Sequence, residues 1–446
     1  MPIPAPRFYF LLVLGLVSAL ALADLLGPGR SAVITLAADG GLLLLALIDG
    51  QLARVRRVQV ERTLIPKLSV GRDNPIELTV TAGKHGAPLR LRDAYPPQFT
   101  VSQSVLTVAI APQRQQTLSY TIHPDQRGQF DWGDVQVRQL GPLGLAWHDW
   151  TVPAAQTVAV YPDLMGLRSL AVRLAVQNSG ALRQSRRLGQ GTEFAELREY
   201  RVGDDTRLID WKATARRSKP LVRVLEPERE QTLIILLDRG RLMTARVQGL
   251  LRFDWGLNAA LALALAGLHR GDRVGIGVFD RELSLWLPPE RGAYRFNRLL
   301  ERLTPLQPAL LEPDYFGAVT QVAEQQPRRA LVVVLTDVVD RTASAELLAA
   351  LMRLSPRYLP FCVTLRDPQV DAIARPPEPQ DESTPAPRRE LAAAYQRAVA
   401  LDLLAQRAIA FAELKRQGVL VLDAPADRIS TQLVDRYLQL KARSLL

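Results

Sequence analysis

The sequence predicts a multi-domain protein with an N-terminal transmembrane helical hairpin, a small all-β sandwich and a C-terminal α/β domain. Three observations support this. Two long apolar stretches open the chain, short runs of alternating polarity follow, and buried strands alternate with helices in the second half. The 446 residues, 48% of them hydrophobic and 23% charged, are too many for one ordinary domain and apolar enough to fold.

The two apolar stretches cover residues 8–26 and 31–48, each close to the length that crosses the hydrocarbon core of a bilayer. Their connection is so short that two helices would run antiparallel, so we expect a transmembrane hairpin within residues 1–54. Asp39 opposes insertion by about 2.5 to 3.5 kcal/mol, and nine Leu, Ile and Val residues of the second stretch roughly offset this cost.

Two other interpretations of this segment stay open. Ala21 and Ala23 form an A-x-A site that would suit a cleavable signal peptide, and the second stretch could be a buried helix of a soluble domain. Basic residues favour one orientation, because four arginines lie in residues 54–62 and Arg7 precedes the first stretch, whereas the connection holds Arg30. We therefore expect a multi-pass protein of the cell inner membrane with most of the chain on the cytoplasmic side.

Residues 55–162 alternate with a period of two in short runs such as 75–82, 106–111 and 115–122, separated by turn residues. This spacing is typical of a small antiparallel sandwich that serves as a spacer or binding module. The histidines of this module have no companion nucleophile nearby in sequence, so we expect them to be structural or exposed.

Residues 163–230 form a connecting region that contains a densely charged cassette at 189–230. Between residues 181 and 229 there are twelve basic and eight acidic side chains, interleaved rather than separated. The net charge of +11 could indicate a nucleic-acid partner, but Asp204, Asp205 and Asp210 would repel phosphates. The mixed signs instead favour ion pairing, and we expect no nucleic-acid binding.

Sixteen residues of this cassette closely resemble the signature of the bacterial family catalogued as domain of unknown function 58. They are Glu193, Phe194, Leu197, Arg198, Glu199, Tyr200, Gly203, Asp204, Asp205, Arg207, Ile209, Asp210, Trp211, Lys212, Ala215 and Arg216. The resemblance implies a von Willebrand factor type A-like, Rossmann-like C-terminal domain and a MoxR-type AAA+ ATPase as partner. With the membrane hairpin and the charged cassette, this leads us to expect a membrane-anchored, non-catalytic adaptor in the assembly or maturation of protein complexes.

The cassette itself allows two roles. Its arginines, aspartates and Trp211 could clamp the segment to the following domain, or its exposed charges could dock a partner. Both roles stay open at the level of the sequence.

Residues 231–446 alternate buried strands with helices, which predicts a parallel, doubly wound sheet. The expected strands are 232–238, 273–280, 330–337, 358–365 and 418–423. The expected helices are 253–269, 295–303, 314–325, 343–354, 389–416 and 426–440. A proline-rich insert at 372–389 should form a surface loop.

Ligands of such sheets bind at the carboxyl ends of the strands, where Asp238 and Asp337 are expected. The resemblance implies a metal-ion-dependent adhesion site there, built on D-x-S-x-S. The motif is incomplete in this chain, because Gly240 and Leu242, which have no side-chain oxygen, occupy the two serine positions. Arg239 and Arg241 also place positive charge where the cation would lie. We expect a degenerate site in which arginines neutralise the aspartates.

A Mg²⁺ ion remains the alternative at this site, with Asp314 or Thr320 supplying a missing oxygen.

Motifs for common enzyme classes are absent from the sequence: it holds no phosphate-binding G-x-x-x-x-G-K-[ST], no H-E-x-x-H and no G-x-S-x-G. Cys362 lies in an apolar strand, where a thiol stays protonated. We expect no enzyme activity and no required cofactor. The alternatives are a divalent-metal-dependent adhesion or receptor module and a hydrolase built on the carboxylates at the strand edge.

Overall fold

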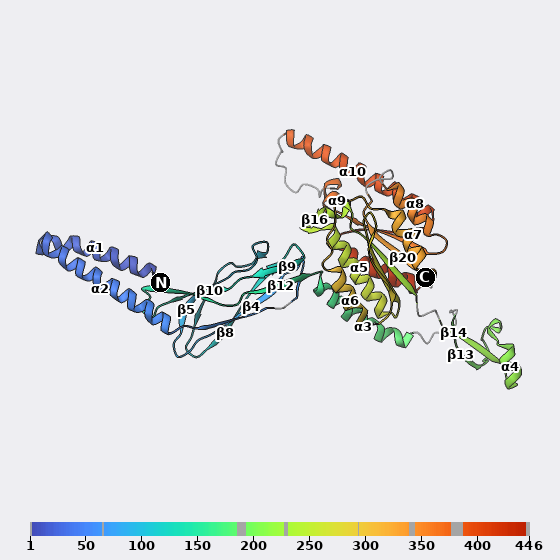
Figure 1. The fold of residues 1–446 in the computed structure, drawn as a ribbon, viewed down its shortest axis with the longest axis horizontal. Coiled ribbons are helices and arrows are strands. Elements are labelled where there is room, and N and C mark those ends of the chain that lie inside the picture. Colours follow the sequence, from blue (N-terminus) through green and yellow to red (C-terminus); the bar gives the residue numbers. More distant parts are fainter. Residues whose placement is uncertain are drawn as a thin grey trace. The chain divides into compact units, whose positions relative to one another are not determined.

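The computed structural model describes residues 2–64, 67–184, 193–226, 231–292, 294–338, 344–375 and 387–442. The chain divides into two compact units, Met1–Tyr161 and Pro162–Leu446, whose elements are drawn in Figure 1. The first unit contains the apolar N-terminal helices and three β-sheets, and the second contains an α/β region.

The first unit begins with two helices, α1 (Pro6–Leu26) and α2 (Pro28–Val55), which pack along each other. Gly27 joins them with a φ of 80°, a left-handed conformation that favours glycine. Among the described helices, one segment, Gly29–Val55, is long and apolar enough to cross a membrane, and α1 adds a shorter apolar stretch, Pro6–Ala21.

Three sheets make up the rest of this unit (Figure 1). The first has the order β1 (Pro2–Pro4), β11 (Ala146–Val152), β10 (Val135–Leu140), β5 (Ala87–Asp93), β7 (Leu106–Ile110). The second has the order β2 (Gln59–Thr63), β4 (Asn74–Thr81), β8 (Gln115–His123), β6 (Thr100–Val101), and the third β3 (Lys67–Ser69), β12 (Gln156–Tyr161), β9 (Gly128–Trp132). Buried and exposed residues alternate along β4 and β5, as expected of strands with one face on a core.

A buried polar cluster connects the three sheets. The Asp93 carboxylate on β5 accepts hydrogen bonds from Arg62 Nη1 (2.6 Å), Trp132 Nε1 (3.0 Å) and the Tyr120 hydroxyl (2.6 Å). Arg62 and Tyr120 belong to the second sheet and Trp132 to the third. Burial and the neighbouring Asp93 raise the pKa of Tyr120, so its hydroxyl stays a donor. One carboxylate therefore links residues of all three sheets.

Asp49, near the end of α2, fixes this helix to the β-sheet. Its carboxylate is fully buried and accepts hydrogen bonds from the backbone N–H groups of Leu143 (2.7 Å), Leu145 (2.8 Å) and Ala146 (3.0 Å). A Cβ on Gly141 would lie 2.3 Å from the Asp49 carboxyl carbon, so this close approach requires glycine. The turn between β10 and β11 is thereby attached to the helix through the Asp49 side chain.

The second unit is built around a six-stranded sheet. Its order is β19 (Leu283–Glu290), β18 (Arg273–Phe279), β15 (Thr232–Asp238), β20 (Leu331–Thr336), β21 (Leu359–Arg366), β22 (Leu420–Pro425). The chain moves outward from β15 to one side and then returns to the other side at β20. The boundary between β15 and β20 is thus a topological switch point, where open α/β sheets bind ligands.

Helices cover both faces of this sheet (Figure 1). The core of one face includes α7 (Tyr315–Gln325), α8 (Ala345–Leu354) and the end of α10 (Pro387–Arg416). The other face is covered by α5 (Arg252–His269), which contacts α3 (Leu164–Gln184), α6 (Tyr294–Leu303) and α11 (Ile429–Ala442). The remaining elements are the short β16 (Arg246–Val247), β17 (Leu250–Leu251), η2 (Arg241–Thr244) and α9 (Pro368–Ala374).

The expectation of an all-parallel sheet is wrong at one edge. Strand β19 pairs antiparallel with β18, in a stretch that carries Pro288 and Pro289 near its end. Proline cannot donate a ladder hydrogen bond and occurs in sheets on edge strands, which is the position of β19. Within the proline-rich insert, residues 376–386 lie outside the described part of the chain.

Candidate functional site

Asp238 lies at the carboxyl end of β15, at the switch point, and is completely buried. Oδ1 accepts the Gly240 N–H (2.7 Å), and Oδ2 accepts the Thr336 hydroxyl (2.6 Å) and the Tyr315 hydroxyl (3.2 Å). Both oxygens are thus occupied by donors of the chain itself. Burial raises the pKa of Asp238 to about 6, although these hydrogen bonds favour the ionised form.

This shift gives a pH dependence of stability. The pKa of an unfolded aspartate is near 4, below that of folded Asp238, so the folded chain binds this proton more tightly than the unfolded chain does. The stability that Asp238 contributes is therefore complete below about pH 4. It is lost as the pH rises towards 6, by a total of about 3 kcal/mol. We expect the free energy of unfolding of wild type, measured with urea, to fall more between pH 4 and 7 than that of Asp238→Asn, because asparagine does not titrate.

Asp204 serves as a comparison, because its contribution to the pH dependence of stability has the opposite sign. A hydrogen bond from Arg198 lowers the pKa of Asp204, so its contribution is present above about pH 4 and lost in acid. Parallel pH profiles for wild type and Asp238→Asn would contradict the assignment.

Asp337 follows β20 on the other side of the switch point and is paired with two arginines. Oδ1 accepts Arg407 Nη1 (2.7 Å) from α10, and Oδ2 lies 2.7 Å from Arg252 Nη1 of α5. Arg407, 6% exposed, also donates to Asp423 Oδ1 on β22 (2.9 Å) and to the Val338 carbonyl. Guanidinium groups therefore neutralise Asp337 and Asp423.

A cavity of about 190 Å³ adjoins this ion-pair network. It is lined by charged and apolar residues of β21, α5, α9 and α10, namely Arg252, Asp337, Leu365, Arg366, Asp367, Val370, Leu403, Leu404 and Arg407. Within the described part of the chain, the buried Nε atoms of Arg252 and Arg407 have no hydrogen-bond partner. Both arginines line the cavity, but these Nε atoms are themselves buried.

The cassette forms a small hairpin with its own core. Strands β13 (Glu193–Glu199) and β14 (Leu221–Glu226) pair antiparallel, and between them lie η1 (Thr206–Leu208) and α4 (Trp211–Arg217). Ile209, Leu221 and Val222 are buried. Gly203 has a φ of 105°, which the turn after β13 requires.

The acidic residues of the cassette hold this local fold together. Asp204 accepts both Nη atoms of Arg198, at 2.6 and 2.7 Å. Asp205 caps η1, and Asp210 caps α4 by accepting the Ala213 N–H at 2.9 Å. Glu199 pairs with Lys219 at 3.0 Å. These carboxylates therefore serve the cassette's own structure.

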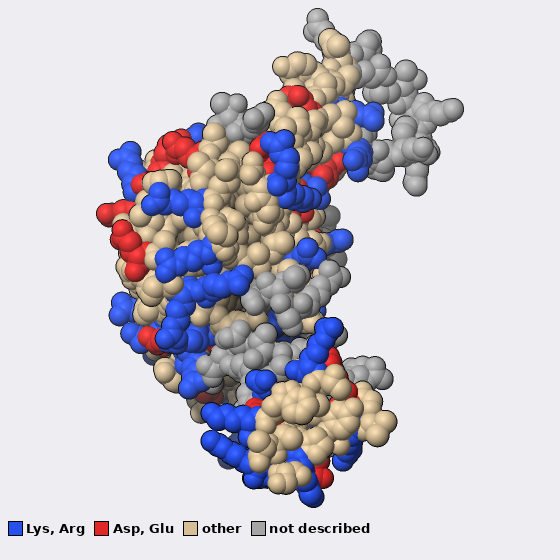
Figure 2. All heavy atoms as spheres, turned by 90° about the vertical axis from the view of Figure 1, so that its right-hand side faces the viewer, with Lys and Arg blue, Asp and Glu red and all other residues tan. Residues whose placement is uncertain are grey.

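The basic residues of the cassette remain largely available at its surface. Arg207, Lys212, Arg216 and Arg217 are exposed, and no ion pair within the described ranges engages their side chains. Trp211 is 70% exposed beside them in sequence. Figure 2 shows the cassette facing the viewer at the lower end, with uncharged surface bordered by Lys and Arg. The arrangement suits an acidic partner surface with an apolar centre.

Comparison with known proteins identifies this part of the chain. A family model described as "Protein of unknown function DUF58" matches residues 196–376. The match covers less than half of the chain, and these residues are similar to the DUF58 family. The match runs from β13 to the end of α9, so this DUF58 region includes the cassette hairpin and both aspartates of the switch point.

The similar curated proteins are uncharacterized. A protein of Mycobacterium tuberculosis is 26% identical over 151 residues, which cover 33% of this chain and 48% of that protein. YeaD of Bacillus subtilis is 25% identical over 224 residues, covering 50% and 54% of the two chains. The alignments thus span about half the length of the relatives.

Among solved structures, BatB, a conserved hypothetical protein from Bacteroides thetaiotaomicron, is matched with a TM-score of 0.30 at 14% identity. The match covers 48% of this chain and 99% of BatB. A CARDB domain from Pyrococcus furiosus in complex with di-metal ions is matched with a TM-score of 0.16 at 16% identity. That match covers 23% of this chain and 87% of the domain.

The other two candidate metal ligands, Asp314 and Thr320, form hydrogen bonds within α7 and its N-terminal turn. Asp314 caps α7 by accepting the Gly317 N–H at 2.7 Å, and the Thr320 hydroxyl donates to the Phe316 carbonyl. No group of three or more His, Cys, Asp or Glu side chains that could hold a metal ion occurs among the described residues.

The arginines expected to neutralise Asp238 have other partners. Arg239 pairs with Asp280 at 2.6 Å and Arg241 with Glu312 at 2.8 Å, so this expectation is wrong. Each guanidinium reaches a carboxylate on a neighbouring loop, while hydroxyl and backbone donors satisfy Asp238.

The cassette residues singled out from the sequence lie on one hairpin, from Leu197 onward. The side chains of Glu193 and Phe194 lie outside the described part of the chain, although both residues belong to β13. Sequence reasoning missed Arg252 and Arg407. Arg407 could have been noticed as a charge on the apolar face of a helix, because Leu403, Leu404 and Phe411 surround it in sequence.

Cys362 is completely buried in β21, where burial raises the pKa of its thiol to about 12. The thiol is therefore uncharged at neutral pH.

Proposed function

We propose that this protein is a membrane-anchored, non-catalytic adaptor whose cassette docks a MoxR-type AAA+ ATPase that assembles or matures protein complexes. The observation that carries this proposal is the surface of the cassette, where Trp211 is 70% exposed and, within the described residues, no ion pair engages the side chains of Arg207, Lys212, Arg216 and Arg217. The identity of the ATPase follows from the family resemblance, and the chemistry of the surface supports an acidic partner.

The membrane anchor in this proposal is a hairpin of α1 and α2, with the bulk of the chain in the cytoplasm. Its support is the exposed apolar surface of α2, which includes Val33, Leu36 and Leu44. Insertion into a bilayer would remove these apolar side chains from water. Strand β1 immediately precedes α1 and pairs with β11, which α2 also contacts, so both polar ends of the helices adjoin the same module.

The von Willebrand factor type A-like assignment of the second unit is part of the same proposal. It is supported by the strand order around β15 and by the single antiparallel strand β19. The switch-point aspartates then form a degenerate site, in which internal donors occupy the oxygens that a cation would need.

Docking through the cassette can be tested with purified full-length chain in detergent and the purified ATPase. We expect Trp211→Ala to weaken binding about tenfold or more, because exposed tryptophans that become buried dominate interfaces. Lys212→Glu with Arg216→Glu should weaken binding further and reduce its salt dependence. None of these changes touches the Arg198–Asp204 pair or the Asp210 cap, so circular dichroism should remain unchanged.

The matched control is Arg328→Glu with Arg329→Glu, which reverses two exposed cations elsewhere in the same unit. We expect this control to bind the ATPase like wild type. Equal binding by the cassette variants and wild type would remove the cassette from the docking role.

A further inference from the structure

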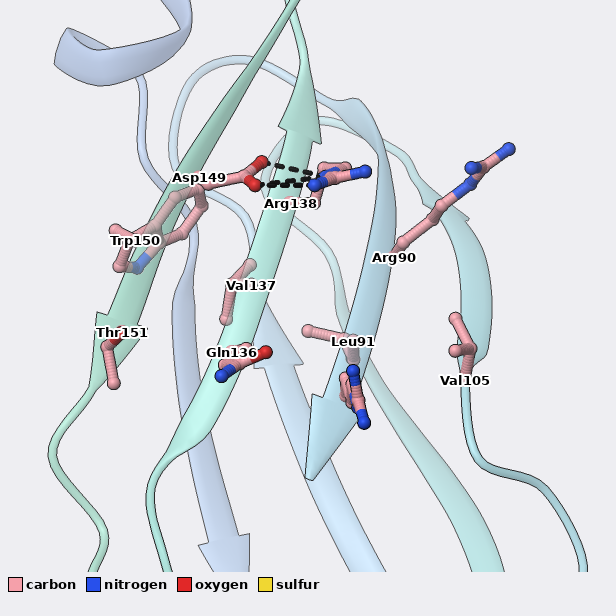
Figure 3. Close-up of a pocket in the computed structure, with 10 residues that line it drawn as sticks. Arg90, Leu91, Val105, Gln136, Val137, Arg138, Asp149, Trp150 and Thr151 are labelled. Atoms are coloured by element: carbon pink, nitrogen blue, oxygen red, sulfur yellow. Dashed lines mark hydrogen bonds and ion pairs between the residues drawn. The ribbon is translucent and has the colours of Figure 1, made fainter. Parts of the chain in front are cut away.

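A groove of about 530 Å³ lies on the sheet formed by β7, β5, β10 and β11 in the first unit (Figure 3). Its lining residues are Arg90, Leu91, Arg92, Val105, Gln136, Val137, Arg138, Asp149, Trp150 and Thr151. Three arginines and one aspartate give this lining a net charge of +2. An open groove with this charge is suited to an anion.

The strand register places the polar residues of the groove in two adjacent rows. Arg90, Arg138 and Asp149 lie opposite one another on three neighbouring strands. Arg92, Gln136 and Thr151 form the next row, two residues along each strand. Because side chains two residues apart share a face of a sheet, all six lie on the same outer face. The sheet thus concentrates donors on one surface.

Arg90 and Arg138 are like charges directly opposite each other, an arrangement that destabilises a sheet unless an anion compensates it. Asp149 compensates Arg138, whose Nε and Nη2 atoms donate to its carboxylate at 2.8 and 2.7 Å, as Figure 3 shows. Arg90 stacks over Trp147, with 5.0 Å between the guanidinium carbon and the ring centroid. This contact orients Arg90 without neutralising it.

Arg92 is exposed in the second row, and no carboxylate within the described ranges pairs with Arg90 or Arg92. The groove therefore contains two guanidinium groups with unused donors, two residues apart on one strand. Gln136 and Thr151 add neutral donors beside them.

We propose that this groove binds a phosphate group through Arg90 and Arg92. A guanidinium group donates two parallel hydrogen bonds to a phosphate or a carboxylate. The net charge of +2 matches a phosphate monoester, which carries a charge near −1.5 to −2, better than a single carboxylate. The amide of Gln136 and the hydroxyl of Thr151 donate to the remaining oxygens.

Such a phosphate monoester can come from a soluble ester or from the headgroup of phosphatidate. The site does not depend on docking by the cassette, because the two lie in different units of the chain.

The test uses the full chain in phosphatidylcholine nanodiscs, titrated with inorganic phosphate at constant ionic strength. Binding is followed by tryptophan fluorescence, because Arg90 stacks over the Trp147 ring. We expect Arg90→Gln with Arg92→Gln to weaken binding about tenfold or more. Lys84→Gln with Arg114→Gln removes two exposed cations of the same unit outside the groove and should leave binding unchanged.

Equal phosphate affinity in the two double variants, or no saturable binding by wild type, would overturn the proposal. So would tighter binding of a glutamate-rich peptide than of phosphate at the same groove, because the ligand would then be a carboxylate. Nanodiscs that contain phosphatidate distinguish the two sources. Loss of the wild-type response to inorganic phosphate there assigns the groove to the lipid headgroup, and an undiminished response assigns it to a soluble phosphate.

Discussion

Replacing Asp93 with alanine is expected to lower the free energy of unfolding of the first unit by about 3 to 5 kcal/mol. The change leaves the Arg62 guanidinium buried without its 2.6 Å partner, since 1% of that side chain is exposed, and an uncompensated buried charge costs this much. It also removes the acceptor for Tyr120 and Trp132. Urea unfolding of the full chain in detergent, followed by tryptophan fluorescence, measures the effect.

The matched control for this prediction is Asp73→Ala. Asp73 lies in the same unit and is 2.9 Å from His123 Nδ1, but both side chains are largely exposed. An exposed ion pair contributes at most about 1 kcal/mol, so we expect a small change. A comparable loss in the two variants would show that the Asp93 cluster does not hold the sheets together.

Arg407→Met should destabilise the α/β region by about 3 to 5 kcal/mol. The variant removes one guanidinium that reaches both Asp337 and Asp423, leaving two carboxylates at the sheet edge with fewer partners. Arg416→Met on the same helix removes an exposed pair with Glu413 and should cost less than about 1 kcal/mol. Thermal unfolding monitored at 222 nm by circular dichroism compares them.

The same measurement with added Mg²⁺ addresses the metal-dependent alternative. We expect Mg²⁺ to leave the wild-type melting temperature unchanged, because the carboxylate oxygens of Asp238 and Asp337 already accept hydrogen bonds from groups of the chain itself. A rise in melting temperature that Asp238→Ala abolishes would instead support a divalent-cation site.

The main strands could be predicted because parallel strands buried on both faces are nearly continuous apolar runs, as in residues 232–238. The edge strand β19 was missed because its exposed, proline-containing sequence lacks that signal. Asp238 and Asp337 were found from their positions after strands. Their partners could not be, since Arg407 is 70 residues from Asp337 and only tertiary packing brings them together.

The cassette contains a contact that is local in sequence and could be predicted, whereas the groove depends on contacts between strands that could not. Arg198 and Asp204 are six residues apart, so a turn between them made a pairing foreseeable. Arg90 and Arg92 alternate on one strand, but the neighbouring Gln136 and Thr151 are identified by strand register, which one sequence does not give.

The attachment of Asp49 to the turn after β10 has a mechanical consequence. Three backbone hydrogen bonds to one carboxylate fix the orientation of the β10–β11 turn relative to the end of α2. If α2 crosses a bilayer as proposed, any tilt it adopts in response to bilayer thickness reorients this turn and its sheet by the same angle. The helix and the attached sheet then move together.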